Sequence, residues 1–591
     1  MENKQYKIYS INGPVITVKN APELRIEEKV LVGNERLVGE VIRTSEDGVI
    51  IQVYEITTGL LPGEPVFSTG APLCVTLGPG LLSNIYDGIQ RPLRELEQNS
   101  GCFIKRGQDV PSLDEQKKYS VKIIVKNGDV LQGGNIYAVC DETKAVVHKC
   151  LVPNGVAGKV IFTAADGECS VNENIITLED EKGNKTELTL CQKWPIRYPR
   201  PIKNRVSSIR PLITGQRVID SLFPIAKGGT AAVPGGFGTG KTMTQHQLAK
   251  WSDADIIVYV GCGERGNEMT QVLDEFGDLI DTKNGTKLTD RTILIANTSN
   301  MPVAAREASI YTGISIAEYY RDMGYHIALM ADSTSRWAEA LREISGRLEE
   351  MPAEEGFPAY LPSRLSQFYE RAGYVNTVSG SEGSITIIGA VSPQGGDFSE
   401  PVTQNTKRFI RTFWALDRNL AYSRHYPAIN WNTSYSEYIP ELEAWYNENI
   451  DKNFLNFRNR IAGILNEENH LMEIVKLIGA DVLPDEQKLV IETAKTIRLG
   501  FLQQNAYHET DTYVPILKQF KMMEIMIYLY DSVKALIDLS IPISQIMQYS
   551  MFEKLIKMKF DIGNDELEKF ELLKQEIDNM INEIREKFKK Q

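Results

Sequence analysis

A glycine-rich segment has the pattern G-x-x-x-x-G-K-T, which is typical of a loop that binds the phosphates of ATP or GTP. Its residues are Gly235-Gly236-Phe237-Gly238-Thr239-Gly240-Lys241-Thr242. The run Thr230–Val233 before it predicts a buried strand and Met243–Trp251 after it predicts a helix, which is the context that the motif requires. Glycines let backbone N–H groups turn inward around a phosphate. We expect Lys241 to reach the terminal phosphates and the Thr242 hydroxyl to bind Mg²⁺, next to the positive end of the helix.

A carboxylate and a guanidinium follow the next predicted strand, Ile256–Val260. They are Glu264 and Arg265, on the glycine turn Gly261–Gly266. Because ligands of a doubly wound sheet bind at the carboxyl ends of its strands, Glu264 is placed to orient or polarise a water for attack on the terminal phosphorus. Arg265 can neutralise phosphate charge or hold Glu264 in a bidentate pair. A purely structural glutamate–arginine turn is the alternative.

An acidic residue also follows the predicted strand Ile327–Met330. This residue, Asp332, is in the position where such sheets hold Mg²⁺, directly or through its waters. Together with the phosphate loop, it indicates the second motif of a nucleotide site. Arg336, on the helix that follows, is expected to be solvated or to lie at an interface.

Two tyrosines are candidates to bind a purine base. Tyr426 lies on an irregular stretch after the predicted sheet, and Tyr507 follows the polar segment Gln503–Ala506. An aromatic face is a simple means of holding a base, but the spacing of these residues alone also fits aromatic side chains that pack in a core.

The chain divides into regions of different pattern, which predict a multidomain α/β protein. Residues 1–75 and 110–192 contain short strands separated by turn signals, typical of a β-barrel and of a β-rich insert. Residues 76–109 and 193–435 are assigned to an α/β nucleotide-binding domain, because strands there alternate with helices. Residues 436–591 are predicted to be helical.

Two local predictions concern helices. A short helix is expected at Ile85–Glu97, where the loop before it ends. The last helix is expected to begin at a cap formed by Asn564, with an apolar stripe along one side. This stripe fits either internal packing or a partner surface.

Composition excludes several classes of protein. The 591 residues carry a formal charge of −13, which argues against a protein that coats nucleic acid, including an RNA-tracking helicase. No run approaches the ~20 apolar residues that span a bilayer, and the first residues lack the pattern of a secretory signal. The seven cysteines are scattered, which predicts neither a disulfide framework nor a zinc site and suits a reducing cytoplasm.

These motifs resemble those of the catalytic A subunit of V-type and archaeal-type rotary ATPases over nearly the whole chain. The segments that carry the resemblance are the phosphate loop with Val233-Pro234 before it, Tyr259–Glu268, Asn297–Pro302, Ala331–Ala340 and Pro401–Thr406. The insert at 110–192 is similar to the region that distinguishes these subunits from their F-type relatives.

The resemblance implies a RecA-like nucleotide-binding domain that binds ATP or ADP with Mg²⁺. It implies that Glu264 is the catalytic carboxylate, that Lys241, Thr242 and Arg265 contact phosphate or Mg²⁺, and that Tyr426 and Tyr507 flank adenine.

The implied assembly is a head in which three such chains alternate with three B subunits, joined to central-stalk and peripheral-stalk subunits and to a membrane ring that moves H⁺ or Na⁺. The chain would then be peripheral, on the cytoplasmic face of a membrane, with no nucleic-acid partner.

Two alternatives stay open, and one departure from the family limits what can be carried over. A hexameric export ATPase shares these motifs, but such proteins are shorter and lack a long β-rich insert. A non-catalytic, nucleotide-holding subunit typically loses the lysine or the carboxylate that this chain keeps as Lys241 and Glu264. Eukaryotic members have a cysteine in the phosphate loop where this chain has Thr239, so a disulfide switch at that position is not expected here.

Overall fold

The computed structural model describes residues 5–46, 48–101, 104–280 and 285–589, which form two compact units. The first unit comprises the described parts of Met1–Ser207, Gly228–Thr230 and Ala254–Ile410, and the second those of Ser208–Lys227, Ala231–Asp253 and Arg411–Gln591. Among the cysteines, Cys102 lies outside the described residues. The division into four domains stays a prediction.

The first unit begins with a closed antiparallel barrel, which confirms the predicted fold of the N-terminal region. Its strands, in the order β1-β2-β5-β4-β3-β6, are β1 (Gln5–Asn12), β2 (Val15–Val18), β3 (Glu28–Val32), β4 (Leu37–Ser45), β5 (Gly48–Val53) and β6 (Pro65–Pro72). Alternate side chains such as Val30 and Val32 are fully buried inside the barrel, as the two-residue period of a strand requires.

The insert contains two antiparallel four-stranded sheets, ordered β10-β13-β15-β16 and β12-β11-β9-β14. The strands are β9 (Tyr119–Ile123), β10 (Val130–Gln132), β11 (Ile136–Asp141), β12 (Val147–Leu151), β13 (Ala157–Thr163), β14 (Gly167–Cys169), β15 (Ile176–Glu179) and β16 (Lys185–Leu188). On either side of the insert, β7 (Cys74–Leu77) and β17 (Gln192–Pro195) pair with each other.

A parallel sheet forms the centre of the first unit, in the order β24-β22-β20-β21-β8. Its strands are β8 (Ile85–Tyr86), β20 (Ile256–Glu264), β21 (Thr292–Thr298), β22 (His326–Asp332) and β24 (Glu382–Val391). The antiparallel strand β23 (Gly373–Asn376) pairs with β24 and also with β18 (Asn204–Val206). The predicted alternation of strands and helices is therefore confirmed.

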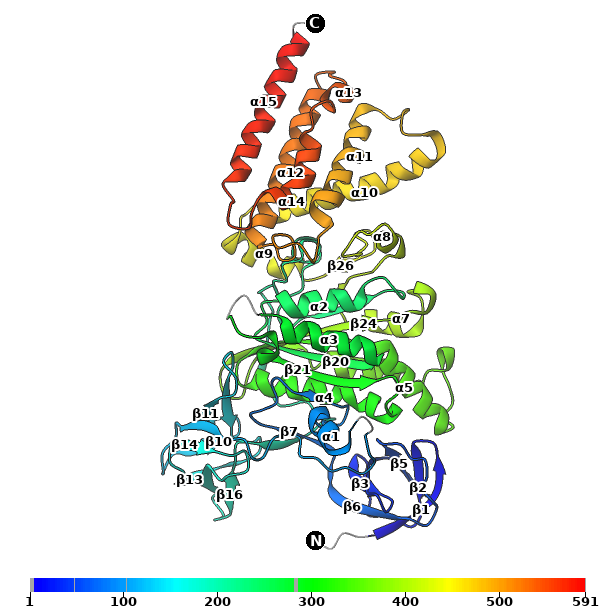
Figure 1. Ribbon diagram of the computed structural model, residues 1–591, viewed down its shortest axis with the longest axis vertical. Coiled ribbons are helices and arrows are strands. Elements are labelled where there is room, and N and C mark those ends of the chain that lie inside the picture. The colour runs from blue at the N-terminus through cyan, green and yellow to red at the C-terminus, as the bar shows by residue number, and fades with distance from the viewer. Residues whose placement is uncertain (1–4, 47, 102–103, 281–284, 590–591) are drawn as a thin grey trace. The chain divides into compact units, whose positions relative to one another are not determined.

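Helices link and cover these strands (Figure 1). They are α3 (Gly266–Asp278), α4 (Val303–Asp322), α5 (Thr334–Arg347), α6 (Leu361–Tyr369) and α7 (Pro401–Lys407). Both faces of the sheet are covered, so the strands are nearly continuous apolar runs, as parallel strands usually are. In β20, every residue except Glu264 is buried.

The helix predicted at Ile85–Glu97 is wrong in its first half. Ile85 and Tyr86 form the buried strand β8, which pairs with β21, and the helix α1 spans only Leu93–Ser100. Pro92 lies at the N-cap of α1. A proline has no N–H to donate, which favours the start of a helix over its interior.

Buried polar groups join the insert to α4 within the first unit. His148 Nδ1 lies 2.9 Å from Glu142 Oε2, and its Nε2 lies 3.0 Å from the Tyr319 hydroxyl. Tyr320 donates to the same carboxylate at 2.9 Å. Because Glu142 accepts hydrogen bonds from His148 and from two backbone N–H groups, its pKa is lowered although it is buried.

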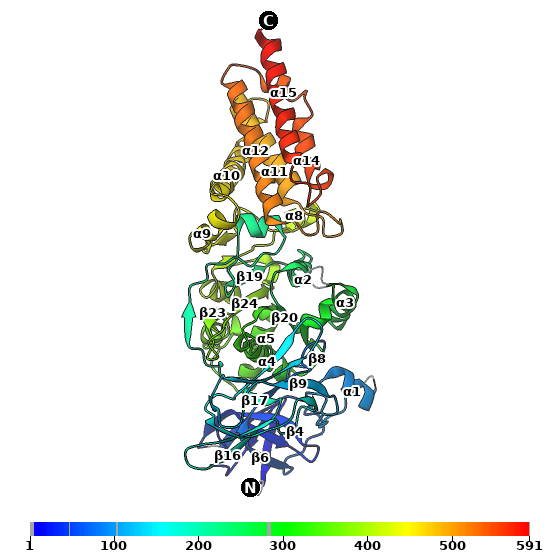
Figure 2. The same cartoon turned by 90° about the vertical axis from the view of Figure 1, so that its left-hand side faces the viewer.

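The second unit combines a small sheet with helices. Strand β19 (Thr230–Pro234), whose residues from Ala231 onward belong to this unit, pairs in parallel with β25 (Thr412–Phe413), and β25 pairs with β26 (Tyr435–Ser436). The helices are α2 (Lys241–Trp251), α8 (Arg418–Tyr422), α9 (Ile439–Asn449), α10 (Phe454–Ile478), α11 (Asp485–Ile497), α12 (Ile516–Ile537), α13 (Ile543–Ile546), α14 (Met551–Asp561) and α15 (Lys569–Lys589), with π-helical turns η1 (Val218–Leu222) and η5 (Arg498–Leu502). Figure 2 shows α11, α12, α14 and α15 side by side.

The helical C-terminal region is confirmed, but its last helix begins later than predicted. Helix α15 starts at Lys569, and Asn564 does not cap it. The Asn564 side chain accepts a hydrogen bond from Lys518 Nζ at 3.1 Å and donates to the Tyr513 carbonyl at 2.9 Å. The apolar stripe of α15 packs against α12, with Ile577 fully buried. Across the described residues, we find no helix that is both long and apolar enough to cross a membrane.

A buried arginine fixes the loop after η5 in the second unit. Arg217, which is fully buried, pairs with the equally buried Asp511 and donates to the carbonyls of Phe501 and Gln503. The other carboxylate oxygen of Asp511 accepts the Asn505 N–H at 2.7 Å. The charge of Arg217 is thus neutralised by one acid that also shapes the loop.

Replacing this acid tests the importance of the pair. Asp511→Ala leaves the Arg217 guanidinium buried without a counter-charge, so we expect the second unit to lose about 3–5 kcal/mol of stability. Urea unfolding followed by circular dichroism measures the loss. The matched control is Asp531→Ala, which breaks the exposed Arg460–Asp531 pair and should change stability by about 0–1 kcal/mol. Equal effects of the two variants would contradict the structural role of Asp511.

Candidate active site

The predicted phosphate loop joins β19 to α2 within the second unit, as the motif requires. Two of its glycines have left-handed backbones, Gly238 with φ 76° and Gly240 with φ 89°. At the other two, Gly235 and Gly236, there is little space for a side chain. A Cβ on Gly235 would lie 2.5 Å from Thr239 Oγ1, and one on Gly236 would lie 2.6 Å from Arg418 Nε. The left-handed backbone favours glycine at 238 and 240, whereas a side chain at 235 or 236 would need Thr239, Leu416 or the flexible Arg418 side chain to move.

The lysine of the loop lies against the loop backbone. Lys241 Nζ donates to the carbonyls of Gly235 at 2.8 Å and Gly236 at 3.1 Å. Thr239 is buried, and its hydroxyl donates to the Gly236 carbonyl at 2.8 Å. The Phe237 side chain is 79% exposed, so this residue can contribute to the loop mainly through its backbone.

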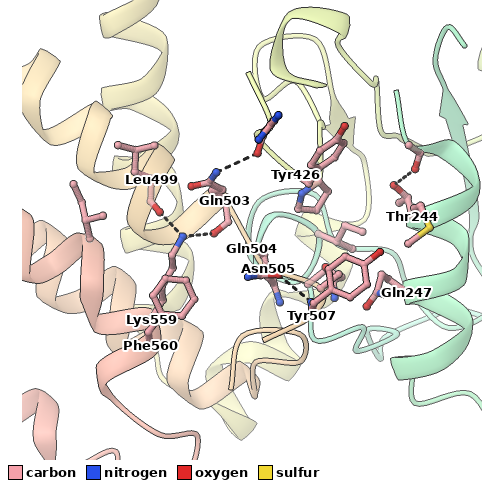
Figure 3. Close-up of a pocket in the computed structure, with 18 of the residues that line it drawn as sticks. Thr244, Gln247, Tyr426, Leu499, Gln503, Gln504, Asn505, Tyr507, Lys559 and Phe560 are labelled. Carbon is pink, nitrogen blue, oxygen red and sulfur yellow. Dashed lines mark hydrogen bonds between the residues drawn. The ribbon is translucent and has the colours of Figure 1, made fainter. Parts of the chain in front are cut away.

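A cavity of about 820 Å³ lies next to the loop within the second unit (Figure 3). Gly238, Gly240 and the α2 residues Thr244 and Gln247 form one wall. The opposite walls come from three later segments and comprise Arg424, Tyr426, Pro427, Leu499, Gln503, Gln504, Asn505, Ala506, Tyr507, Ile556, Lys559 and Phe560. The volume falls in the range of about 300–1,000 Å³ that is typical of small-molecule sites.

The structure brings both candidate tyrosines to this cavity. The Tyr426 ring lies beside the loop, since a Cβ on Gly240 would be 3.5 Å from its Cε1. Tyr507 is 88% exposed, so the alternative that it packs in a core is wrong. The two segments are held together by the Gln504 N–H, which donates to the Tyr426 carbonyl at 2.8 Å.

Sequence analysis missed the polar wall of the cavity. Lys559 Nζ donates to the carbonyls of Leu499 at 2.7 Å and Gln503 at 3.0 Å (Figure 3). Burial and the charge of Arg217 lower the pKa of Lys559 to about 8. Lys559 lies more than fifty residues beyond Tyr507 and belongs to no motif, so no sequence pattern indicated it.

The first unit carries the predicted carboxylates. Glu264 is the last residue of β20 and Asp332 the last of the neighbouring β22. Burial raises the pKa of Glu264 to about 9, and the negative charges of Asp332 and Glu268 act in the same direction. The Tyr259 hydroxyl donates to Asp332 Oδ2 at 3.2 Å. Sequence analysis correctly placed both acids at strand ends, but it did not include Glu268.

The turn before Glu264 fits closely against two arginines. Gly263 has φ 75°, and a Cβ there would lie 2.8 Å from Arg336 Cβ and 3.1 Å from Arg306 Cδ. The positive charge of Arg336 opposes the rise in the pKa of Glu264, while Arg336 itself pairs with Glu339 at 2.8 Å. Arg265 is exposed at the N-cap of α3.

Within the described part of the chain, no three histidine, cysteine, aspartate or glutamate side chains form a cluster that could hold a metal ion. The oxygen groups predicted to bind Mg²⁺ are the Thr242 hydroxyl, at the start of α2, and the Asp332 carboxylate.

Four family models match the chain. They describe the ATP synthase alpha/beta family nucleotide-binding domain (residues 215–436), the alpha/beta subunit barrel-sandwich domain (110–197), the C-terminal domain of V and A type ATP synthase (443–547) and the alpha/beta family beta-barrel domain (8–70). Along the chain, the matches fall on the N-terminal barrel, the β-rich insert, the α/β region and the C-terminal helices, in that order.

Curated relatives match the chain over almost their full length. The V-type ATP synthase alpha chain 2 of Clostridium tetani is 58% identical over 99% of this chain and 98% of its own. The A subunit of the A-type ATP synthase of Methanopyrus kandleri is 53% identical over 98% of both chains. Among solved structures, the ATPase EscN of an enteropathogenic E. coli type III secretion system has a TM-score of 0.62 and 22% identity, covering 88% of this chain and 99% of its own. This last likeness concerns the fold alone.

The exposed tyrosine of the cavity offers a test of base binding. Stacking on an aromatic ring contributes about 1–3 kcal/mol per base, so we expect Tyr507→Ala to weaken ATP binding by about 10-fold or more. Isothermal titration calorimetry with ATP measures the change. Tyr422→Ala removes a tyrosine that is 81% exposed and does not line the cavity, and it should leave the affinity unchanged. An unchanged affinity in Tyr507→Ala would contradict the assignment.

Proposed function

This chain belongs to the alpha and A subunits of the V-type and A-type ATP synthases, and from that premise we propose that it hydrolyses and synthesises ATP in a rotary head. The main support for this proposal is that the chain has both an intact phosphate loop with Lys241 and a carboxylate, Glu264, at the end of a central strand. A non-catalytic subunit typically lacks one of these groups. The insert and the match to the V- and A-type C-terminal domain argue against an export ATPase.

We assign separate roles to the residues of the site. Lys241 and the N–H groups of the phosphate loop bind the terminal phosphates, because the loop and the helix N-terminus present positive charge. Glu264 accepts a proton from the attacking water or orients it. Arg265 neutralises phosphate charge, and Tyr426 and Tyr507 hold adenine between them.

Mg²⁺ fits the oxygen groups that the chain offers. The ion prefers hard oxygen ligands and is commonly held by one or two protein groups together with substrate phosphates. The Thr242 hydroxyl and the Asp332 carboxylate are such groups. When bound, Mg²⁺ neutralises charge on the phosphates. A cation near the acids of the first unit would also lower the pKa of Glu264, which burial and the neighbouring negative charges raise to about 9.

The assembly that we propose is a head of three such chains alternating with three B subunits. ATP turnover in this head would drive a central stalk and, through it, a membrane ring that moves H⁺ or Na⁺. A peripheral stalk would hold the head, and the chain would lie peripherally on the cytoplasmic face of the membrane.

The role of Glu264 is tested by an isosteric change in the assembled complex. Glu264→Gln keeps the shape of the side chain and removes its basicity, so we expect kcat to fall by at least ~10²-fold while ATP affinity changes little. Lys241→Ala is the contrasting variant, because it removes a cation from the phosphates and should abolish both binding and turnover. Steady-state ATPase assays and nucleotide titration measure the two effects. A Glu264→Gln complex that loses affinity but keeps its rate at saturating ATP would show that Glu264 only positions phosphate.

Activity should also depend on the neighbouring B chain. Phosphoryl transfer commonly needs an arginine finger, worth ~10³–10⁵ in rate and often supplied by another chain. Arg265 directly follows Glu264 in the sequence, and in this proposal it neutralises phosphate charge but is not the finger. We therefore expect the purified chain to hydrolyse ATP poorly and the rate to rise steeply as hexamers form with B subunits. Full activity of a verified monomer, unchanged by the partner, would rule out a shared site.

A further inference from the structure

A second cavity, of about 560 Å³, lies entirely within the first unit, and more arginines than glutamates line it. Three glutamates and six arginines line it, namely Glu27, Glu318, Glu370, Arg197, Arg200, Arg205, Arg321, Arg364 and Arg371. The walls come from the segment 197–205, from α4 and from α6 with the turn after it. Whether the cavity binds a ligand depends on which of these charges are already neutralised.

Two of the arginines are fully engaged. Arg371 donates twice to Glu318, at 2.9 and 2.6 Å, and also to the Ile196 carbonyl. Arg197 pairs with Glu307 at 2.6 Å and with Glu40 at 2.8 Å. These ion pairs hold the wall of the cavity together and leave no charge for a ligand.

Arg200 is different because one of its buried donors is unused. The residue is 4% exposed, and its Nε donates to Asp322 at 2.6 Å. Its guanidinium lies 4.8 Å from the centre of the Trp194 ring. Its Nη1, although buried, has no hydrogen-bond partner in the part of the chain that the structure describes. A buried donor without a partner is unfavourable by about 1–3 kcal/mol, more when it is charged. Because Arg200 is one of the residues that line the cavity, a ligand bound there is a candidate acceptor for this donor.

Arg205 and Arg364 keep their charge because their partners are neutral. Arg205 donates to the backbone carbonyls of Ala372 and Glu370, and Arg364 donates to the Gln367 side-chain amide at 3.4 Å. Among the described residues, no carboxylate forms an ion pair with either arginine. Both lie on the wall of the same cavity as Arg200.

We propose that this cavity binds a phosphate group, held by Arg200, Arg205 and Arg364. Guanidinium groups bind phosphate and carboxylate in the same bidentate manner, so charge decides between the two. A phosphate group carries about −1.5 to −2 charges at pH 7, which matches the two arginines without a carboxylate partner, Arg205 and Arg364, and the unused donor of Arg200 better than a single carboxylate does. No residue of the phosphate loop lines this cavity, so the phosphate that it binds is held by a different set of residues from those around Lys241.

The probe is inorganic phosphate and the local reporter is Trp194, which lies against Arg200. The experiment uses the full chain with Lys241→Ala, so that the phosphate loop contributes little to binding. Tryptophan fluorescence is followed during titration with phosphate at constant ionic strength, and Trp194→Phe shows which part of the signal is local. We expect a saturable change that Trp194→Phe removes. Since no ATP turnover is measured, the test is independent of the proposed catalytic function.

Matched variants then locate the site. Arg205→Gln with Arg364→Gln should weaken phosphate binding at least 10-fold, and Arg43→Gln with Arg94→Gln, which removes two exposed arginines away from the cavity, should not. Thermal unfolding provides a second measure, because a ligand that binds only the folded chain stabilises it by RT ln(1 + [L]/Kd) and so raises the midpoint as its concentration increases. The proposal is overturned if chloride or succinate of equal ionic strength gives the same response, if no saturable change occurs, or if both double variants behave alike.

Discussion

The cavity beside the phosphate loop of the second unit depends on one buried guanidinium. Arg217 has no access to water, and an unpaired charge in such a place is strongly unfavourable. Its donors are therefore satisfied by Asp511 and by carbonyls of the segment that leads to Tyr507. The backbone N–H of Arg217 donates to Oε1 of the Gln504 side chain. The backbone N–H of Gln504 in turn donates to the Tyr426 carbonyl. The hydrogen bonds of Arg217 thus help to fix the segments that carry Tyr426 and Tyr507, the two tyrosines of the cavity wall.

The two units carry clusters of opposite charge. The residues that line the cavity of the second unit include Arg424 and Lys559 but no aspartate or glutamate. The acids Glu264, Glu268 and Asp332 gather in the first unit, where their mutual repulsion and burial raise the pKa of Glu264. The cavity of the second unit therefore suits an anion, whereas a cation close to the acids of the first unit would relieve their repulsion.

Sequence analysis found the parts of the fold and site that are local in the chain. The phosphate loop and the acids at the ends of β20 and β22 are contiguous motifs, so residue type and spacing were enough to predict them. Features that depend on distant segments were missed. Lys559 reaches the cavity from α14, and the apolar pair Ile85 and Tyr86 became a strand only because β21 offers an edge to pair with. Asn564 is a residue type that often caps the start of a helix, but here its side chain forms hydrogen bonds with Lys518 and with the Tyr513 carbonyl instead.

Buried arginines in this chain differ in whether their donors are satisfied, and this difference separates structural from ligand-binding roles. Arg217 and Arg371 direct their guanidinium groups to carboxylates and carbonyls of their own unit, so each links segments of the fold. Arg200 is nearly as buried but leaves Nη1 without a partner among the described residues. The Arg200 guanidinium gains an ion pair with Asp322 and contacts with the rings of Trp194 and Tyr319, but none of these contacts accepts the hydrogen bond of Nη1, whose desolvation is unfavourable. A ligand that accepts its hydrogen bond supplies the missing compensation, and this reasoning distinguishes the cavity at Arg200 from a network that merely holds the fold together.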